Sequence, residues 1–443
     1  MVPASDQGSR LVSELERLLR EPGCPACRYV SETERTFFSW FQIESFSSPA
    51  VQAQLRAGLG MCPAHSRRLV EELGEGHIMT TVAREALSGA LQLIGAQTQA
   101  GACPACEVVA NGSRRACQLV LDGLLDPALT RLYSQHGGMC LAHVLESLPF
   151  AGPSDARMLA GRLLERLYEE LGPALLEVLA GLDDDAPRRA LWRERLPELP
   201  QRGSTVDRLR GVIQIDACPV CLSTGVAERD YFDWFLSRSA AHDQSLRSDP
   251  GEFCRDHLHD VAAVDSASAA SAAIDHKRAT RIAHLERFLA RLSQLPAPEK
   301  RGRRSKPDGL EQIRAELLTG SYCAACHARD GVERSRLDLV AASLSLAPTR
   351  QRYEGGHGLC LRHALQMSDG PAARVARRHL DGRLSVLAWE VGEVARKYAW
   401  AYRHEASGPE HDAWMRALAQ IDGRVFVGAP APAGKAPGPP RAE

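Results

Sequence analysis

Cysteine and histidine are the residues of this chain most suited to chemistry, because they recur in a fixed pattern. The 443-residue sequence contains 13 cysteines, and twelve of them form four repeats of a Cys-x-x-Cys pair followed by a Cys-x-x-His pair. The steps from the second to the third cysteine of a repeat are 35, 34, 33 and 34 residues. The four repeats comprise Cys24, Cys27, Cys62 and His65; Cys103, Cys106, Cys140 and His143; Cys218, Cys221, Cys254 and His257; and Cys323, Cys326, Cys360 and His363.

Three thiolates and one imidazole are the donor set of a structural zinc site. Zn²⁺ prefers four such donors in a tetrahedron, and two cysteines separated by two residues can both reach one ion from a tight turn. Since each Cys-x-x-Cys is followed by its own Cys-x-x-His, we expect each repeat to close one site. The sequence therefore predicts four Zn²⁺ ions, each with all four positions filled by protein, which is typical of structural rather than catalytic sites.

Other chemistry for the same cysteines stays open. Iron–sulfur clusters are also held mainly by cysteine and sometimes by histidine, so four clusters for electron transfer or redox sensing are the alternative cofactor. Cys323, Cys326 and His327 match the Cys-x-x-Cys-His of c-type haem attachment, but the match occurs once, and we interpret His327 as a helix-surface residue. The thirteenth cysteine, Cys117, is expected to be a small buried hydrophobic residue.

The segments between these pairs read as helices. Apolar residues between Tyr29 and Phe41 recur with a roughly 3.6-residue period, Pro49 interrupts the pattern, and Val51–Leu59 forms a second segment that ends at Gly60. A longer helical stretch is expected from His65 through Ile94. No segment predicts a strand, and even 211–215 continues a helical run. The fold class predicted is all-α, with tandem helical repeats in which each metal pins two helix N-termini together.

The repeats share more than the proposed ligands. An arginine stands eight residues after each second cysteine, and a glutamate precedes it in three repeats, as Glu34, Glu228 and Glu333. Repeats 1 and 3 share an aromatic block, 37–41 and 231–235, which we interpret as core beside the metal. Repeats 2 and 4 instead share Tyr133 and Tyr353, each seven residues before the third cysteine, with His136 and His357 beside glycines and expected in surface turns. This alternation indicates duplication of a two-site unit.

Domain limits follow from the duplication and from composition. Residues 1–185 form the first predicted two-site unit and 204–428 the second, with a linker at 186–203. A basic, proline-bracketed linker at 296–307 separates repeats 3 and 4, and the Pro/Ala-rich residues 429–443 are expected to be disordered.

Composition limits the possible environments and partners. The formal net charge is −1, so no overall field draws the chain to nucleic acid, and a nucleic-acid-binding regulator ranks third among the functions considered. The N-terminus lacks the apolar segment of a signal peptide, and no apolar run is long enough to span a bilayer. We therefore expect a cytoplasmic protein without membrane insertion, whose clustered cysteines stay reduced and available to metal.

The motifs together resemble an uncharacterised bacterial family with paired CPxC and GxCxxH motifs. The resemblance covers most of residues 15 to 424, including the closing segment 396–418, and implies a bacterial, metal-pinned helical protein without implying a reaction. This chain departs from the pattern by carrying four motif pairs where two or so are expected. It also has Glu252 in place of the glycine of repeat 3 and Ala324 in place of the proline of repeat 4.

No P-loop, nucleophile elbow or HExxH motif is present in the sequence. The function expected is therefore a non-catalytic zinc-binding scaffold or adaptor that presents helical faces to another bacterial protein.

Overall fold

The computed structural model describes residues 4–73, 76–96, 100–136, 138–170, 172–180, 217–240, 254, 257, 267–294 and 323–423. Within these residues every regular element is a helix, so the predicted all-α class is confirmed. The predicted linkers at 186–203 and 296–307, the tail at 429–443 and the segment 211–215 lie outside the described residues.

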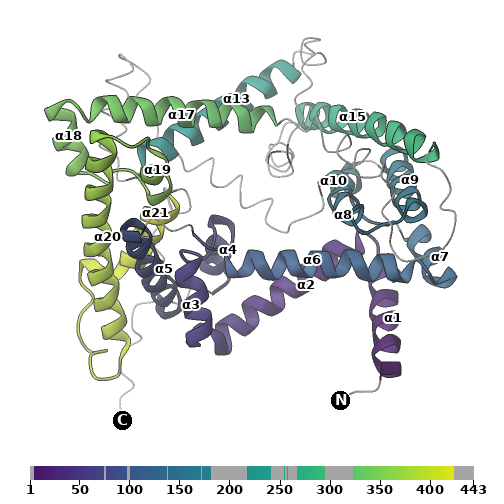
Figure 1. Ribbon diagram of the computed structural model, residues 1–443, viewed down its shortest axis with the longest axis horizontal. Coiled ribbons are helices and arrows are strands. Elements are labelled where there is room, and N and C mark those ends of the chain that lie inside the picture. The colour runs from purple at the N-terminus through teal and green to yellow at the C-terminus, as the bar shows by residue number, and fades with distance from the viewer. Residues whose placement is uncertain are drawn as a thin grey trace. The chain divides into compact units, whose positions relative to one another are not determined.

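The elements follow one another along the chain as Figure 1 labels them. Those before residue 181 are α1 (Ala4–Arg20), α2 (Pro25–Trp40), the π-helix η1 (Phe41–Ser45), α3 (Pro49–Ala57), α4 (Pro63–Leu73), α5 (Gly76–Ala96), α6 (Pro104–Gly123), α7 (Pro127–Gln135), α8 (Leu141–Ser147), α9 (Pro153–Glu169) and α10 (Gly172–Ala180). Those after residue 216 are α13 (Pro219–Ala240), α15 (Ala267–Ser293), α17 (Ala324–Ser343), α18 (Ala347–Glu354), α19 (Leu361–Gln366), α20 (Pro371–Tyr398), the 3-10 helix η3 (Pro409–Asp412) and α21 (Ala413–Asp422).

The cysteine pairs sit where helices begin. In the first three repeats the proline of the Cys-Pro-x-Cys motif is the first residue of α2, α6 and α13. Proline suits that position because its fixed φ is helical and the amide hydrogen that it lacks has no partner within the helix. The second cysteine then falls in the first turn. α17 begins at Ala324, so the alanine of repeat 4 leaves this start unchanged.

One predicted helix limit is confirmed and one differs from the structure. The first helical pattern ends before Pro49, which begins α3 with extended Ser48 as the residue before it. The single helical stretch expected from His65 through Ile94 is two helices, α4 and α5. The residues between the two, 74–75, are outside the described part of the chain.

The chain folds into two compact units, and each takes elements from both halves of the sequence. Unit 1 comprises Met1–Arg35, Val108–Leu191 and Glu228–Ala328, and unit 2 comprises the rest. The boundaries fall inside α2, α6, α13 and α17. This grouping in space differs from the predicted division of the sequence at 1–185 and 204–428, which stays a prediction about duplication.

In unit 1, helices α9 and α10 of the first half pack against α15 of the second, and α8 packs against α9 and α10 (Figure 1). The packing is apolar at its centre, where Leu159, Leu163, Leu285 and Leu292 are almost fully buried. Arg157 also donates to the carbonyl oxygen of Leu292 at 3.2 Å. Burial of leucines from both halves makes unit 1 one core rather than two.

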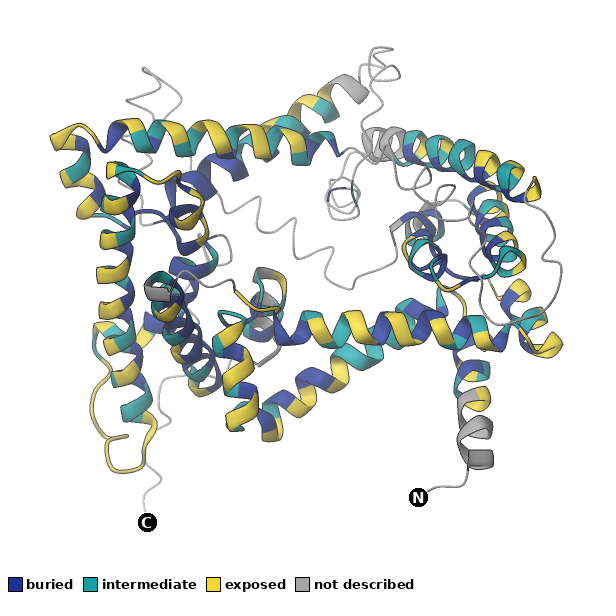
Figure 2. Cartoon of the chain, viewed as in Figure 1, coloured by how far each residue is buried: buried dark blue, intermediate teal, exposed yellow. Residues whose placement is uncertain are grey.

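In unit 2, α5 packs against α3, α20 and α21. The buried face of α20 carries apolar residues spaced by three or four, Leu380, Leu384, Leu387 and Val391, and Figure 2 shows the opposite face exposed. Helix α5 lies in the core, and its residues Ile78, Val82, Ala86 and Ala90 are inaccessible to solvent. No described helix combines the length and hydropathy needed to cross a bilayer.

Candidate metal centres

The sixteen predicted ligands come together in four groups, each with three cysteines and one histidine. The donor atoms of a group lie within 4.8 Å of one another, so four sites that could bind a metal ion are present. The groups are group A, Cys24, Cys27, Cys140 and His143; group B, Cys62, His65, Cys103 and Cys106; group C, Cys218, Cys221, Cys360 and His363; and group D, Cys254, His257, Cys323 and Cys326.

The expected pairing within each repeat is wrong. Each group takes the Cys-x-x-Cys of one repeat and the Cys-x-x-His of its neighbour, so repeats 1 and 2 exchange half-sites to form groups A and B, and repeats 3 and 4 form groups C and D. Groups A and D lie in unit 1, and groups B and C lie in unit 2.

The cause of the exchange is the helix that begins at each cysteine pair. α2 starts directly after Cys24 and has 16 residues, which carry the chain about 24 Å from that pair. The next Cys-x-x-His of the chain is therefore delivered away from Cys24 and Cys27. A constant spacing within repeats therefore does not show that the two halves of a repeat contact each other.

The donors match the edges of a tetrahedron around a single ion. Bond lengths of about 2.3 Å to sulfur and 2.0–2.1 Å to nitrogen place sulfur about 3.8 Å from sulfur and about 3.6 Å from nitrogen. In group A, His143 Nδ1 lies 3.3 Å from Cys27 Sγ and 3.6 Å from Cys24 Sγ, and Cys27 Sγ lies 3.6 Å from Cys140 Sγ.

The same geometry recurs in the other groups. The spacing from Nδ1 to sulfur is 3.2–3.5 Å in group B, 3.2–3.4 Å in group C and 3.2–3.4 Å in group D. All described cysteines are free of disulfide bonds. Every histidine turns Nδ1 inward, which leaves Nε2 for a second partner.

Charge crowding also favours a cation at the centre of each group. Burial raises the pKa of Cys24, but hydrogen bonds with Cys140 and Cys27 outweigh it and hold the pKa well below its usual range. Hydrogen bonds with Cys140 and Cys24 raise the pKa of Cys27 far above its usual range. The protein alone therefore stabilises only part of the group as thiolate, and a divalent ion would balance the rest.

A glycine two residues before the third cysteine shapes the turn into the Cys-x-x-His pair. Gly60, Gly138 and Gly358 have φ of +89°, +68° and +72°, in the left-handed region where a side chain is strained. The chain then reverses and starts a helix, with Cys140 and Cys360 directly before α8 and α19. Glu252, the expected exception, lies outside the described residues. Each Cys-x-x-His thus occupies a helix N-terminus in groups A, B and C, as predicted.

The aromatic blocks of repeats 1 and 3 place a phenylalanine against the histidine of groups B and D. The Phe38 ring lies 6.0 Å from the His65 ring, and the Phe232 ring lies 5.4 Å from that of His257. Both phenylalanines are buried, so the interpretation of the blocks as core beside the sites is confirmed for them. The tryptophans of the blocks, Trp40 and Trp234, are 47% and 40% exposed.

Repeats 2 and 4 use a buried tyrosine instead. Tyr133 and Tyr353 are 1% and 0% exposed, and their hydroxyl oxygens accept hydrogen bonds from the backbone N–H groups of Met139 and Leu359 at 3.1 and 2.9 Å. These donors belong to the residues directly before Cys140 and Cys360. The tyrosines therefore hold in place the backbone segments that lead into groups A and C.

Two of the three shared glutamates, Glu228 and Glu333, contact a histidine of a group. Glu228 Oε1 lies 2.7 Å from His257 Nε2, and Glu333 Oε1 lies 3.4 Å from His363 Nε2. Burial lowers the pKa of His257, but hydrogen bonds with the thiols of its group and with Glu228 raise it, to about 12. Such carboxylates orient a metal-binding imidazole and increase its basicity. The sequence pattern marked these glutamates without revealing this role.

Helix α21 contributes two contacts to group C that no sequence pattern indicated. Gln420 Nε2 donates to the carbonyl oxygen of Leu359 at 2.9 Å, next to Cys360. Gly423 ends the helix with φ of +76°, and a Cβ there would lie 2.5 Å from Cys221 Sγ. The main chain thus passes directly against the group, which only glycine permits without displacement.

The remaining residues of interest have mixed outcomes. Cys117 is fully buried, its Sγ lies 3.6 Å from the carbonyl oxygen of His143, and burial raises its pKa to about 11, as expected for an inert thiol. His136 and His327 are exposed, in agreement with prediction. His357 is 5% exposed with Nδ1 3.2 Å from the carbonyl oxygen of Gly358, so the expectation of a surface residue is wrong.

Comparison of the chain with protein-family models, with curated proteins and with solved structures finds no match.

Proposed function

We propose that the protein is a non-catalytic scaffold in which four Zn²⁺ ions fasten helix N-termini and so present helical faces to another protein in a bacterium. The observation that carries this proposal is the closure of the four groups. Each offers three sulfurs and one nitrogen within 4.8 Å, which is a complete tetrahedral set with no position left for water or substrate.

The size of the groups favours a single ion over an iron–sulfur cluster. A cluster places several irons and inorganic sulfides between its protein ligands, so ligands of different irons lie farther apart than ligands of one ion. Here the sulfur pairs lie 3.6 Å apart in group A and 3.8 Å apart in groups C and D, close to the edge expected around one Zn²⁺.

The surface of α20 supports a protein partner. Val386 and Trp389 of this helix are 56% and 68% exposed, and Trp400, just after the helix, is 75% exposed. Large exposed apolar side chains of this kind are enriched where proteins bind one another. The resemblance to the bacterial family with CPxC and GxCxxH motifs is compatible with the same proposal, since it implies metal-pinned helices and names no activity.

Metal analysis with a visible spectrum of protein purified without air tests the proposal. We expect four zinc ions per chain and no absorbance above 320 nm, because Zn²⁺ has a filled d shell. Iron and inorganic sulfide in comparable amounts, with visible absorbance, would replace the scaffold by the electron-transfer or redox-sensing alternative.

Removal of the metal tests its structural role. A structural zinc site contributes about 10–16 kcal/mol of apparent binding free energy at pH 7, so a strong chelator should unfold the helices. Circular dichroism would follow the loss, and re-addition of Zn²⁺ should restore it. Full helicity after complete removal of the metal contradicts the proposal.

The partner surface is tested with a paired variant. W389S with W400S changes two exposed residues, and we expect it to keep four metals but to lose a partner that co-purifies with the wild-type chain. V12S, at another exposed position, is the control. A nucleic acid that binds in a salt-dependent way, in place of a protein, would favour the third function.

A further inference from the structure

A pocket of about 590 Å³ lies between groups B and C inside unit 2. Cys62 and Cys103 of group B line it on one side, and Cys221 and His363 of group C line it on the other. The volume lies within the range of small-molecule sites. Four of its lining residues are ligands of groups B and C, but a single ion fills only a small part of such a volume, so the scaffold role leaves the rest of the pocket unexplained.

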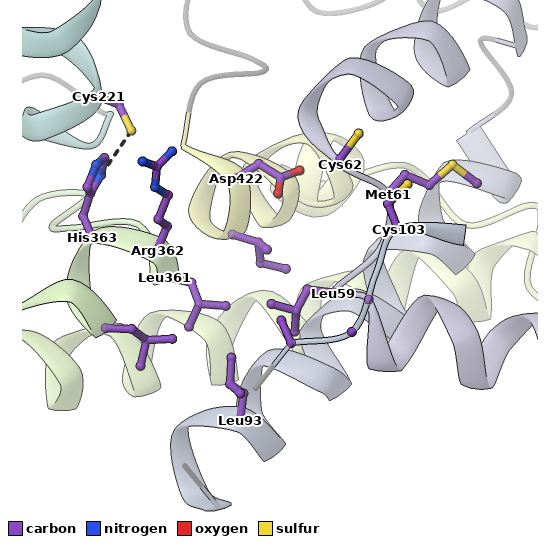
Figure 3. A pocket seen from close by; sticks show the side chains of 15 residues that line it. Leu59, Met61, Cys62, Leu93, Cys103, Cys221, Leu361, Arg362, His363 and Asp422 are labelled. Carbon is purple, nitrogen blue, oxygen red and sulfur yellow. Dashed lines mark hydrogen bonds between the residues drawn. The ribbon is translucent and has the colours of Figure 1, made fainter. Parts of the chain in front are cut away.

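The pocket has a polar side and an apolar side. Figure 3 shows the carboxylate of Asp422 and the guanidinium of Arg362 on the side of the cysteines, with Leu59, Leu93 and Leu361 opposite them. An apolar wall with a few converging polar groups is the usual composition of a ligand site.

Asp422 is the polar group without a partner. Its Oδ2 is inaccessible to solvent and makes no hydrogen bond, although a carboxylate oxygen has room for two. Arg362, the cation lining the pocket, is paired with Glu333, since Arg362 Nη2 donates to Glu333 Oε1 at 2.9 Å. A buried carboxylate in this state is costly unless a cation or a donor comes from outside.

The two groups add negative charge to the same pocket. Three thiolates with one divalent ion leave a net charge of −1 on each group, and this part of the argument rests on the proposed metal loading. Burial, with Cys103 beside it, raises the pKa of Asp422 well above its usual range, and a cation at Oδ2 would offset that cost. A ligand for this pocket therefore needs a positive head and an apolar body.

We infer that the pocket binds an organic cation, an ammonium or guanidinium group on an aliphatic stem, with the head at Asp422 and the stem against Leu59, Leu93 and Leu361. The cation would be either a free amine or the side chain of a lysine or arginine in a partner protein. Both present the same chemistry to Asp422.

Three probes with one body and different heads test the inference. Hexylammonium, hexanol and hexanoate are titrated separately into the full-length, metal-loaded protein and followed by calorimetry. We expect hexylammonium to bind at least about tenfold more tightly than hexanol, and hexanoate not to bind. Equal affinity of the wild-type protein for hexylammonium and hexanol would overturn the inference, and this measurement needs no variant.

Substitution of the carboxylate is the second test. D422N keeps the shape of the side chain and removes its charge, and it should reduce hexylammonium affinity to that of hexanol. D369N, at a carboxylate that is 89% exposed, is the control and should bind as the wild type does. Undiminished binding by D422N would refute the role of Asp422.

Peptides and metal counts separate the remaining outcomes. A lysine-containing peptide that binds more tightly than hexylammonium, with its acetyl-lysine form inactive, identifies a partner side chain as the source, and the reverse order identifies a free amine. Four metals per chain without amine binding refute this inference alone. Amine binding that depends on Asp422 in protein without metal supports the inference and refutes the proposed scaffold.

Discussion

The exchange of half-sites between repeats makes an integer prediction about metal content. Two variants each lose four donors. The crossed variant, C24S/C27S/C140S/H143A, removes all donors of group A and none of any other group. The within-repeat variant, C24S/C27S/C62S/H65A, removes two donors from group A and two from group B. A site that keeps two of four donors loses the tetrahedral set that Zn²⁺ requires.

We therefore expect three metals per chain in the crossed variant and two in the within-repeat variant. If each repeat closed its own site, the two numbers would be reversed. Native mass spectrometry counts the metals on each folded chain, so partial unfolding of a preparation does not blur the count. C117S is the control and should keep four, because the Cys117 thiol belongs to no group. Two metals in the crossed variant together with three in the within-repeat variant would falsify the exchanged pairing.

Three further predictions concern residues beside the groups. E228A removes the acceptor 2.7 Å from His257 Nε2 and should weaken metal binding at group D by about 10- to 100-fold in chelator competition. E333A should weaken group C less, because Glu333 lies 3.4 Å from His363 Nε2, and D230A, at an exposed carboxylate, is the control. G423A places a Cβ 2.5 Å from Cys221 Sγ at a left-handed φ and should lower the metal affinity of group C by at least about tenfold, while G382A, with open space around it, should leave that affinity unchanged. Y353F leaves the buried N–H of Leu359 without its acceptor and should reduce the free energy of unfolding by about 1–3 kcal/mol in urea titration, an effect that Y402F at an exposed ring should not reproduce.

The composition of the sites could be predicted because it depends on local chemistry. A cysteine pair at Cys24 and Cys27 with proline between them predicts both a metal half-site and a helix start, and the structure has α2 beginning at that proline. The alternation of motifs along the chain likewise separated repeats 1 and 3, which use Phe38 and Phe232, from repeats 2 and 4, which use Tyr133 and Tyr353.

The pairing of half-sites could not be predicted because it depends on where helices carry the chain. All four Cys-x-x-Cys pairs are chemically equivalent, and so are the four Cys-x-x-His pairs, so residue type does not select among their combinations. The roles of Glu228 and Gly423 were hidden for the same reason. Glu228 reaches His257 across 29 residues, and Gly423 reaches Cys221 across the second half of the chain.

The exchanged pairing is nested, and this order sets how the sites can form. Group B closes the segment 66–102, which lies inside the segment 28–139 closed by group A, and group D lies inside group C in the same way. The outer loop is roughly threefold longer for group A and roughly twofold longer for group C, which costs about 1 and about 0.6 kcal/mol more in closure entropy, so an inner group forms more readily in an open chain.

Once an inner group holds its metal, it joins the two ends of the inner segment and shortens the loop that the outer group must close. The inner ion thus favours the outer one without any contact between them. Each half of the sequence carries one such nested pair. The four metals are therefore expected to bind as two cooperative pairs, B with A and D with C, rather than as four independent ions.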